Sequence, residues 1–181
     1  HRGDIRIYWG GGGGHYDDLL LTKEPLLRIC KERPNVKLVF SNFIPDWAAD
    51  LPPYQVFMVR FAHFNAYPKV LKWLCADIAL APLVDNEFNR CKSNIKYLTY
   101  AMSDIPSVYS DCEAYDSVIH GLTGLKAKTS DDWYDSINLL IENKTLAASI
   151  AHQAKRDVLT RFTIDQHIAH YESMLKELVD R

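Results

Sequence analysis

The sequence predicts a doubly wound α/β domain, in which a parallel sheet is covered by helices on both faces. Between residues 4 and 128, short β-branched or apolar runs alternate with segments of helical periodicity. The strand candidates are apolar along most of their length, as strands buried on both faces are. The chain has 181 residues, 48% of them hydrophobic, which suits one domain with a full core.

The first half of the chain contains three strand candidates. The expected elements are a strand over 4–10, a helix over 15–33 that is kinked or restarted at Pro25, strands over 35–41 and 54–61, and a helix over 67–76. The first strand runs directly into the glycine run Gly10–Gly14.

The second half continues the alternation and then becomes helical. The expected elements are a strand over 76–83, a helix over 93–103, a strand over 106–110, a short helix over 116–121 ended by Gly121, a strand over 124–128, and helices over 129–143, 144–160 and 163–179.

Periodicity predicts the buried sides of these last helices. Thr129 and Asp132 form a capping-box pattern at the start of the helix over 129–143. The expected apolar stripes are Trp133, Ile137, Leu140 and Ile141 in that helix, Ala147, Ile150, Ala154 and Val158 in the next, and Ile164, Ile168, Tyr171, Leu175 and Leu178 in the last. We expect a single domain, with the last helix either docked on it or reaching towards a neighbour. We also expect Trp47, Trp73 and Trp133 to lie in or near the core.

Composition excludes several classes of protein. The net charge of −2 gives no global basic field, so nucleic acid is not an expected partner. The apolar runs are too short to span a bilayer and no signal peptide is visible, so we expect a cytoplasmic protein. The cysteines lack metal-ligand spacing, so we expect four free thiols in a reducing compartment and no metal ion; they are Cys30, Cys75, Cys91 and Cys112. The chain starts at His1, as a fragment of a longer protein or a tag remnant would.

A ligand of such a sheet binds beyond the carboxyl ends of the strands, near the point where strand order reverses. Three segments arrive there: residues 9–19, 60–68 and 81–94. In the first, the amides of a glycine run can approach an anion closely. This run matches neither a dinucleotide-binding fingerprint nor a P-loop, and a plain turn is the alternative.

The helix that begins near Lys92 is a stronger candidate for an anion site. Its first-turn amides and its dipole favour a negative charge, and Ser93 and Asn94 are suitable N-caps. At helical spacing, Lys92, Lys96 and Thr99 share one face. The opposite, apolar face is expected to consist of Ile95, Leu98 and Met102. A solvated helix with two surface lysines is the alternative interpretation.

These stretches resemble the C-terminal, donor-binding domain of GT-B retaining glycosyltransferases, in the "glycosyl transferases group 1" (family 4-like) set. The resemblance covers about residues 5–174. The matching residues are His15, Asp18 and Leu19 after the first strand, and Asp77, Pro82, Phe88, Asn89, Lys92, Ser93, Lys96, Tyr100 and Pro106 in the block over 77–110.

The resemblance implies a nucleoside-diphosphate sugar as donor substrate, with no cofactor and no metal ion. The diphosphate would lie against Lys92, Ser93, Asn94 and the glycine turn Gly12, Gly13 and Gly14. The base would lie near residues 61–64, with His63 lining its pocket. His15 and Glu87 are the candidates nearest the chemistry. The acceptor, a glycan, polysaccharide or lipid-linked molecule, would bind an N-terminal domain outside these residues. The full-length protein could associate with a membrane peripherally.

One position departs from the family pattern. The family carries a glutamate at position 99 that binds the ribose hydroxyls, and a second acid eight residues earlier; here the residues are Thr99 and Cys91. A threonine cannot offer a bidentate carboxylate. Ribose binding is therefore expected to be weaker, made by other groups, or absent. Two alternatives stay open: a non-catalytic module of the same fold that serves interaction or assembly, and another nucleotide-binding α/β domain such as a phosphate-binding regulator.

Overall fold

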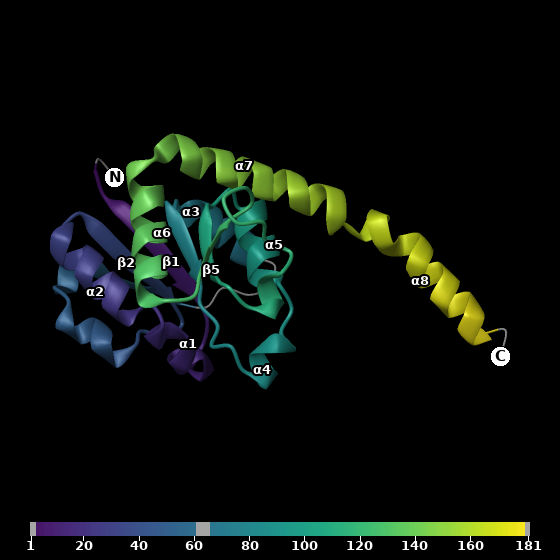
Figure 1. Cartoon of the computed structure of the whole chain (residues 1–181), viewed down its shortest axis with the longest axis horizontal. Helices are drawn as coiled ribbons and strands as arrows, with labels where there is room; N and C mark the ends of the chain where they lie inside the picture. Colours follow the sequence, from purple (N-terminus) through teal and green to yellow (C-terminus); the bar gives the residue numbers. More distant parts are fainter. Residues whose placement is uncertain (1–2, 61–65, 180–181) are drawn as a thin grey trace.

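A computed structural model of the chain describes residues 3–60 and 66–179, and it contains the expected doubly wound sheet (Figure 1). Its parallel strands are β1 (Ile5–Gly10), β2 (Val36–Ser41), β3 (Val56–Val59), β4 (Ile78–Ala81), β5 (Ser107–Ser110) and β6 (Leu125–Ala127). The spatial order is β3-β2-β1-β4-β5-β6, so strand order reverses between β1 and β4. The predicted fold class is confirmed.

Helices connect the strands and follow the sheet. They are α1 (Tyr16–Leu20), α2 (Lys23–Glu32), α3 (Tyr67–Leu74), α4 (Glu87–Arg90), α5 (Ile95–Met102), α6 (Ser130–Glu142), α7 (Lys144–Arg161) and α8 (Ile164–Val179). Short 3-10 turns lie at Gly13–His15, Asp46–Asp50, Pro53–Gln55 and Glu113–Tyr115.

The two faces of the sheet carry separate cores. Along β1, Trp9 packs into the core beneath α2 and α6, and Tyr8 packs into the core beneath α3 and α5. Helix α7 crosses from one face to the other, because Ile150 belongs to the first core and Val158 to the second. The apolar stripes predicted for α6 and α7 are buried, and the capping box between Thr129 and Asp132 is formed.

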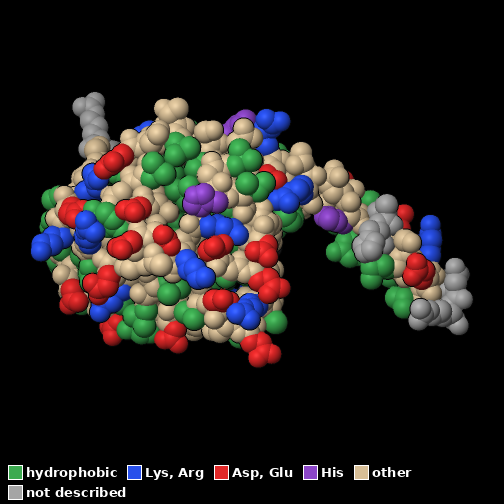
Figure 2. All heavy atoms as spheres, viewed as in Figure 1, with side chains coloured by type: hydrophobic (Ala, Val, Ile, Leu, Met, Phe, Trp, Pro, Cys, Tyr) green, Lys and Arg blue, Asp and Glu red, His purple; other side chains and the backbone are tan. Residues whose placement is uncertain are grey.

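Helix α8 leaves the body of the domain (Figure 1). Its predicted stripe is exposed at every position, from 50% at Ile168 to 74% at Ile164. Figure 2 shows hydrophobic side chains along this projecting arm. Of the two outcomes expected for the last helix, reaching outward is the one observed.

The predicted break in the first helix is present, but α2 begins at Lys23, two residues before Pro25; Pro25 lies in its first turn, where a missing N–H disturbs no helical bond. Two other local predictions were wrong. Residues 116–121 form no helix: His120 pairs with Gly124 in an isolated bridge, and Gly121 adopts a left-handed φ of 77° in the turn between them. Trp73 is 76% exposed, whereas Trp47 and Trp133 are buried as expected.

The buried face of α5 also differs from the prediction. Ile95 and Met102 are 54% and 45% exposed, and the helix buries Tyr97, Tyr100 and Ala101 instead. A tyrosine can be buried when its hydroxyl finds an acceptor, and Tyr97 Oη donates to Asp157 Oδ2 at 2.6 Å. Compared with the prediction, α5 is rotated about its axis, so that Lys96 faces Trp9 at the end of β1.

Candidate functional site

The candidate site lies at the carboxyl end of the sheet, between the segment after β1 and the start of α5. The first glycines after β1 are needed for packing. A Cβ on Gly10 would lie 2.5 Å from Tyr8 Oη, and one on Gly11 would lie 2.6 Å from the Trp9 ring. Gly12 and Gly14 have open space around them, and the Gly12 carbonyl accepts from the His15 N–H at 3.0 Å. The turn predicted to approach an anion is thus open on its outer side.

A buried carboxylate, Asp18 on α1, joins the two walls of the site. It is 4% exposed. Its Oδ2 lies 2.8 Å from His15 Nδ1, and its Oδ1 accepts from the Val84 N–H and from Asn89 Nδ2, both at 2.8 Å. Burial by itself raises the pKa of Asp18, but the hydrogen bonds from His15, Val84 and Asn89, together with the Lys92 charge, outweigh it and hold the pKa below 3.8.

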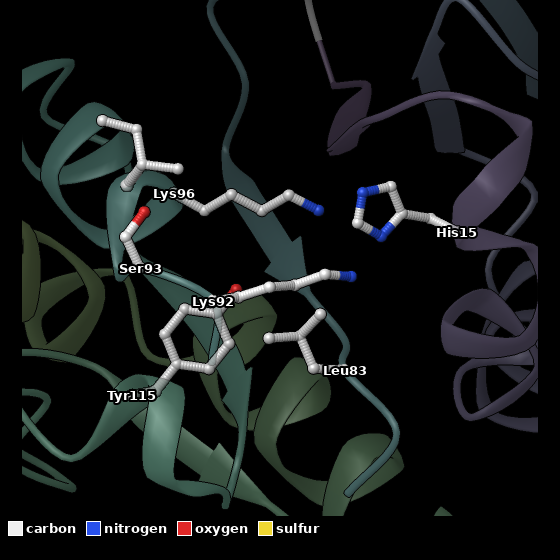
Figure 3. Close-up of a pocket in the computed structure, with 7 residues that line it drawn as sticks. His15, Leu83, Lys92, Ser93, Lys96 and Tyr115 are labelled. Carbon is white, nitrogen blue, oxygen red and sulfur yellow. The ribbon is translucent and has the colours of Figure 1, made fainter. Parts of the chain in front are cut away.

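Two lysine side chains point into the space in front of His15 (Figure 3). Lys92 Nζ lies 3.7 Å from Asp18 Oδ2 and 4.9 Å from the centre of the Phe88 ring. Lys96 Nζ is buried 5.2 Å over the Trp9 ring and has no hydrogen-bond acceptor among the described residues. Burial lowers the pKa of Lys96 to about 8; the Asp18 charge opposes this shift and the Lys92 charge adds to it.

These groups line a pocket of about 170 Å³, formed by His15, Leu83, Lys92, Ser93, Ile95, Lys96 and Tyr115. Two ammonium groups face it, and Asp18 is the one carboxylate close to them among the residues that the structure describes. A buried ammonium group without an acceptor is costly unless an anion pairs with it. The arrangement is therefore suited to a compact, multiply charged anion.

The start of α5 adds amide donors to this pocket. Asn94 occupies the N-cap position, but its side chain accepts no capping bond. Its Nδ2 donates to Ser117 Oγ at 2.9 Å. Ser93 is exposed and lines the pocket. The predicted capping by these two side chains is therefore not seen. First-turn amides without a side-chain cap leave donors for an anion.

The remaining predicted site residues lie elsewhere. Thr99 Oγ1 donates to the Ile95 carbonyl at 2.7 Å, within its own helix, and Thr99 does not line the pocket. Glu87 is exposed in the first turn of α4, outside the pocket lining. His63 and the proposed base-binding segment 61–64 lie outside the described residues. The structure thus brings together His15, Lys92 and Ser93, beside the glycine turn.

Sequence reasoning missed two residues that matter here. Lys96 was placed on the Lys92 face by its spacing but was not taken as a site residue. Its burial depends on Trp9 at the end of β1, which periodicity alone does not reveal. Asp18 appears among the residues that match the family but not among the predicted site residues, and the structure shows it bonded to His15, Val84 and Asn89.

The described part of the chain contains neither a metal-binding cluster nor a membrane-spanning helix. Within residues 3–60 and 66–179, no group of three or more histidine, cysteine or acidic side chains is arranged to hold a metal ion. In the same ranges, no helix has both the length and the apolar character required to cross a membrane. All four cysteines are free thiols, as expected, with Cys30 and Cys112 buried.

None of the known family models matches the chain, and no curated protein matches it in sequence. Solved structures do match. The C-terminal domain of the glycosyl transferase group 1 family protein LpcC from Francisella tularensis aligns over 89% of this chain and 87% of its own, with a TM-score of 0.70 and 16% identity. HepE from Anabaena, solved with UDP-glucose, aligns over 94% of this chain and 49% of its own, with a TM-score of 0.73 and 18% identity.

A glycosyltransferase from Rickettsia africae aligns over 99% of this chain and 49% of its own, with a TM-score of 0.79 and 12% identity. The fold is therefore that of the C-terminal domain of GT-B glycosyltransferases. At these identities the likeness concerns the fold. The chain spans about half the length of the HepE and Rickettsia proteins.

Proposed function

We propose that this chain binds a nucleoside-diphosphate sugar and forms the donor-binding half of a glycosyltransferase. The observation that carries the proposal is the buried Lys96 ammonium group, which finds no acceptor within residues 3–60 and 66–179 and faces the same pocket as Lys92. A diphosphate would supply the missing acceptors. The pocket lies beside the point where strand order reverses, which is where sheets of this kind bind nucleotides.

The same groups suit the chemistry of sugar transfer. In that reaction the bond from the sugar's anomeric carbon to the diphosphate breaks, and a bond to an acceptor oxygen forms. The diphosphate leaves with the bonding electron pair, so negative charge grows on it. Lys92, Lys96 and the first amides of α5 would stabilise this charge. The two ammonium groups would neutralise it without a metal ion.

Other parts of the reaction rest on the resemblance. The acceptor, a glycan, polysaccharide or lipid-linked molecule, would be held mostly by a second domain, so this half alone would not turn over substrate. HepE was solved with UDP-glucose, which makes uridine nucleotides the first ligands to try. The glycine turn Gly12–Gly14 would lie against the diphosphate, and Glu87, outside the pocket lining, would contact the hydroxyls of the donor sugar. The sugar-transfer reaction would take place in the cytoplasm.

Calorimetry at pH 7 with UDP, GDP, UDP-glucose and inorganic pyrophosphate tests the proposal. Lys96→Met and Lys92→Met should each weaken nucleotide binding by at least about tenfold, since each removes a charge-assisted contact of about 1.5–3 kcal/mol. Lys31→Met, on an exposed part of α2, is the matched control and should bind as the unchanged chain does. If no nucleotide binds at millimolar concentration, or if both pocket variants bind normally, the proposal fails.

One observation favours the second candidate, a non-catalytic module of the same fold. Thr99 stands where the family has its ribose-binding acid, and its hydroxyl is already bound to the Ile95 carbonyl. Thr99→Glu would restore a carboxylate at this position. A gain in affinity for UDP over pyrophosphate would indicate a weakened donor site. No nucleotide binding in either form would favour an interaction module.

A further inference from the structure

A second cationic pocket lies at the opposite end of α5. Its volume is about 250 Å³, and it is lined by Lys69, Lys72, Met102, Ser103, Asp104 and Lys155. These residues come from α3, from the end of α5 and from α7. The eight residues of α5 rise ~12 Å along the helix axis, which separates this pocket from the Lys92–Lys96 site.

The charge of this pocket is mostly unpaired. Lys155 Nζ forms an ion pair with Asp104 Oδ2 at 2.6 Å, and Asp104 is the one acid in the described lining. Lys69 and Lys72 are exposed and make no ion pair within the described part of the chain. The pocket therefore presents two lysines to an external partner, although the whole chain has a net charge of −2.

An exposed tryptophan stands beside these lysines on α3. Lys69, Lys72 and Trp73 are spaced i, i+3 and i+4, so they share one side of the helix. The other side is anchored in the core through Leu71 and Leu74, which are 0% and 5% exposed. Trp73 is 76% exposed. Tryptophan with flanking lysines is the combination that favours the boundary between lipid headgroups and acyl chains.

We propose that the α3 surface formed by Lys69, Lys72 and Trp73, with the adjoining pocket, docks this domain on an anionic lipid bilayer. The lysines would approach lipid phosphates, with one headgroup entering the pocket, and the Trp73 ring would insert among the headgroups. The charges of the surface and of such a membrane are complementary. This inference is independent of nucleotide binding, because the two pockets lie at opposite ends of α5.

Vesicle co-sedimentation tests the proposal. The chain should bind vesicles of phosphatidylcholine mixed with phosphatidylglycerol at least about tenfold better than vesicles of pure phosphatidylcholine. In about 0.5 M salt the affinity for the two kinds of vesicle should become nearly equal, because salt screens the charges. The double variant Lys69→Glu/Lys72→Glu should abolish binding. The matched control is Lys23→Glu/Lys31→Glu on α2, which changes the charge equally on the other face of the sheet and should leave binding intact.

Trp73 provides a second readout. The other tryptophans, Trp9, Trp47 and Trp133, are at most 4% exposed. Quenching by acrylamide therefore reports mainly on Trp73, and anionic vesicles should protect it. The proposal is overturned by equal binding to both kinds of vesicle, by equal loss in the control variant, or by unprotected Trp73. It is also overturned if these lysines bind a soluble acidic polysaccharide and no vesicle. The nucleotide affinity of Lys69→Glu/Lys72→Glu should stay unchanged, which separates this proposal from the previous one.

Discussion

Lys96 combines two properties that conflict in the free protein. Its charged Nζ lies 5.2 Å from the centre of the Trp9 ring, and this buried atom has no hydrogen-bond acceptor in the described structure. Burial therefore lowers the pKa of Lys96 to about 8, from 10.5. A lysine whose pKa is lower in the folded than in the unfolded chain destabilises the fold while it is charged, because the folded state disfavours the charged form. Such a residue is expected where binding is favoured at the expense of stability.

The first prediction concerns Lys96 and pH. Between about pH 8 and 10.5 the unfolded chain keeps a proton on Lys96 that the folded chain has lost, so the free energy of unfolding should rise with pH in this window. Lys96→Met should remove that rise and stabilise the fold at pH 7 by about 1–3 kcal/mol. Urea denaturation across this pH range measures both effects. A variant less stable than the unchanged chain at pH 7 would contradict the assignment.

The same residue predicts how binding depends on pH. Diphosphate affinity should fall as the pH rises from 7 to 9, because Lys96 loses its charge near pH 8. In Lys96→Met the affinity should be lower at pH 7 and nearly constant across this range. Calorimetry with UDP at several pH values, corrected for buffer ionisation, provides the measurement. A constant affinity in the unchanged chain would show that the Lys96 charge is not used.

Replacing Asp18 should have the opposite effect on stability from replacing Lys96, although stability rises with pH through both titrations. Its pKa is held below 3.8, so its carboxylate stabilises the fold above that pH, and this contribution is lost as the pH falls through the lowered value. At pH 7, Asp18→Asn should reduce the free energy of unfolding by about 1–3 kcal/mol, since the bonds to His15 and Lys92 lose their charge. The exposed neighbour Asp17→Asn should change it by less than about 0.5 kcal/mol. Equal effects at the two positions in urea denaturation would rule out this role for Asp18.

At the scale of the element, α8 differs from every other long helix. Its apolar stripe is exposed. Within the described structure, His167 Nε2 of α8 lies 2.9 Å from the Arg161 carbonyl at the end of α7. Removal of residues 163–181 should therefore change the free energy of unfolding by less than about 1 kcal/mol. Fluorescence of the buried Trp9, Trp47 and Trp133 in urea follows the transition.

A longer deletion is the control for this prediction. Removal of residues 144–181 also takes away α7, whose Ile150 and Val158 are 1% and 5% exposed and belong to the two cores. That chain should lose its cooperative transition. If the shorter deletion were equally damaging, α8 would contribute packing that its exposure does not show.

Elements with strong periodicity were predictable from the sequence, and those that depend on tertiary contacts were not. The strands and α6 follow from apolar runs and a capping box, which are local signals. The predicted orientation of α5 was wrong because Tyr97 can be buried: its hydroxyl donates to Asp157 on α7, 60 residues away in sequence. The error over residues 116–121 has a local cause instead: His120 pairs with Gly124, four residues further on, and Gly121 adopts a left-handed φ of 77° in a tight turn where a helix was expected.

The candidate site was predictable in position but not in detail. The rule that ligands bind at the carboxyl ends of parallel strands placed the segments after β1 and β4 together, and the structure confirms that placement. The contacts of Asp18 join residues 71 apart in sequence, so no local pattern could reveal them. The burial of Lys96 depends in the same way on a tryptophan from the first strand.

At the scale of the whole molecule, ligand binding at one end of the sheet should stabilise the entire domain. A ligand that binds only the folded state adds about 2.7 kcal/mol at roughly 100 times its Kd. For a chain of this size that corresponds to a rise in Tm of ~5–10 °C.

UDP at this excess should therefore shift the thermal transition of the unchanged chain. It should shift Lys69→Glu/Lys72→Glu equally, because that surface lies at the far end of α5. At the same UDP concentration it should shift Lys96→Met by no more than about half as much, because an affinity about tenfold weaker leaves at most ~1.4 kcal/mol. Differential scanning fluorimetry is the measurement, and an equal shift in Lys96→Met would place the nucleotide outside the Lys92–Lys96 pocket.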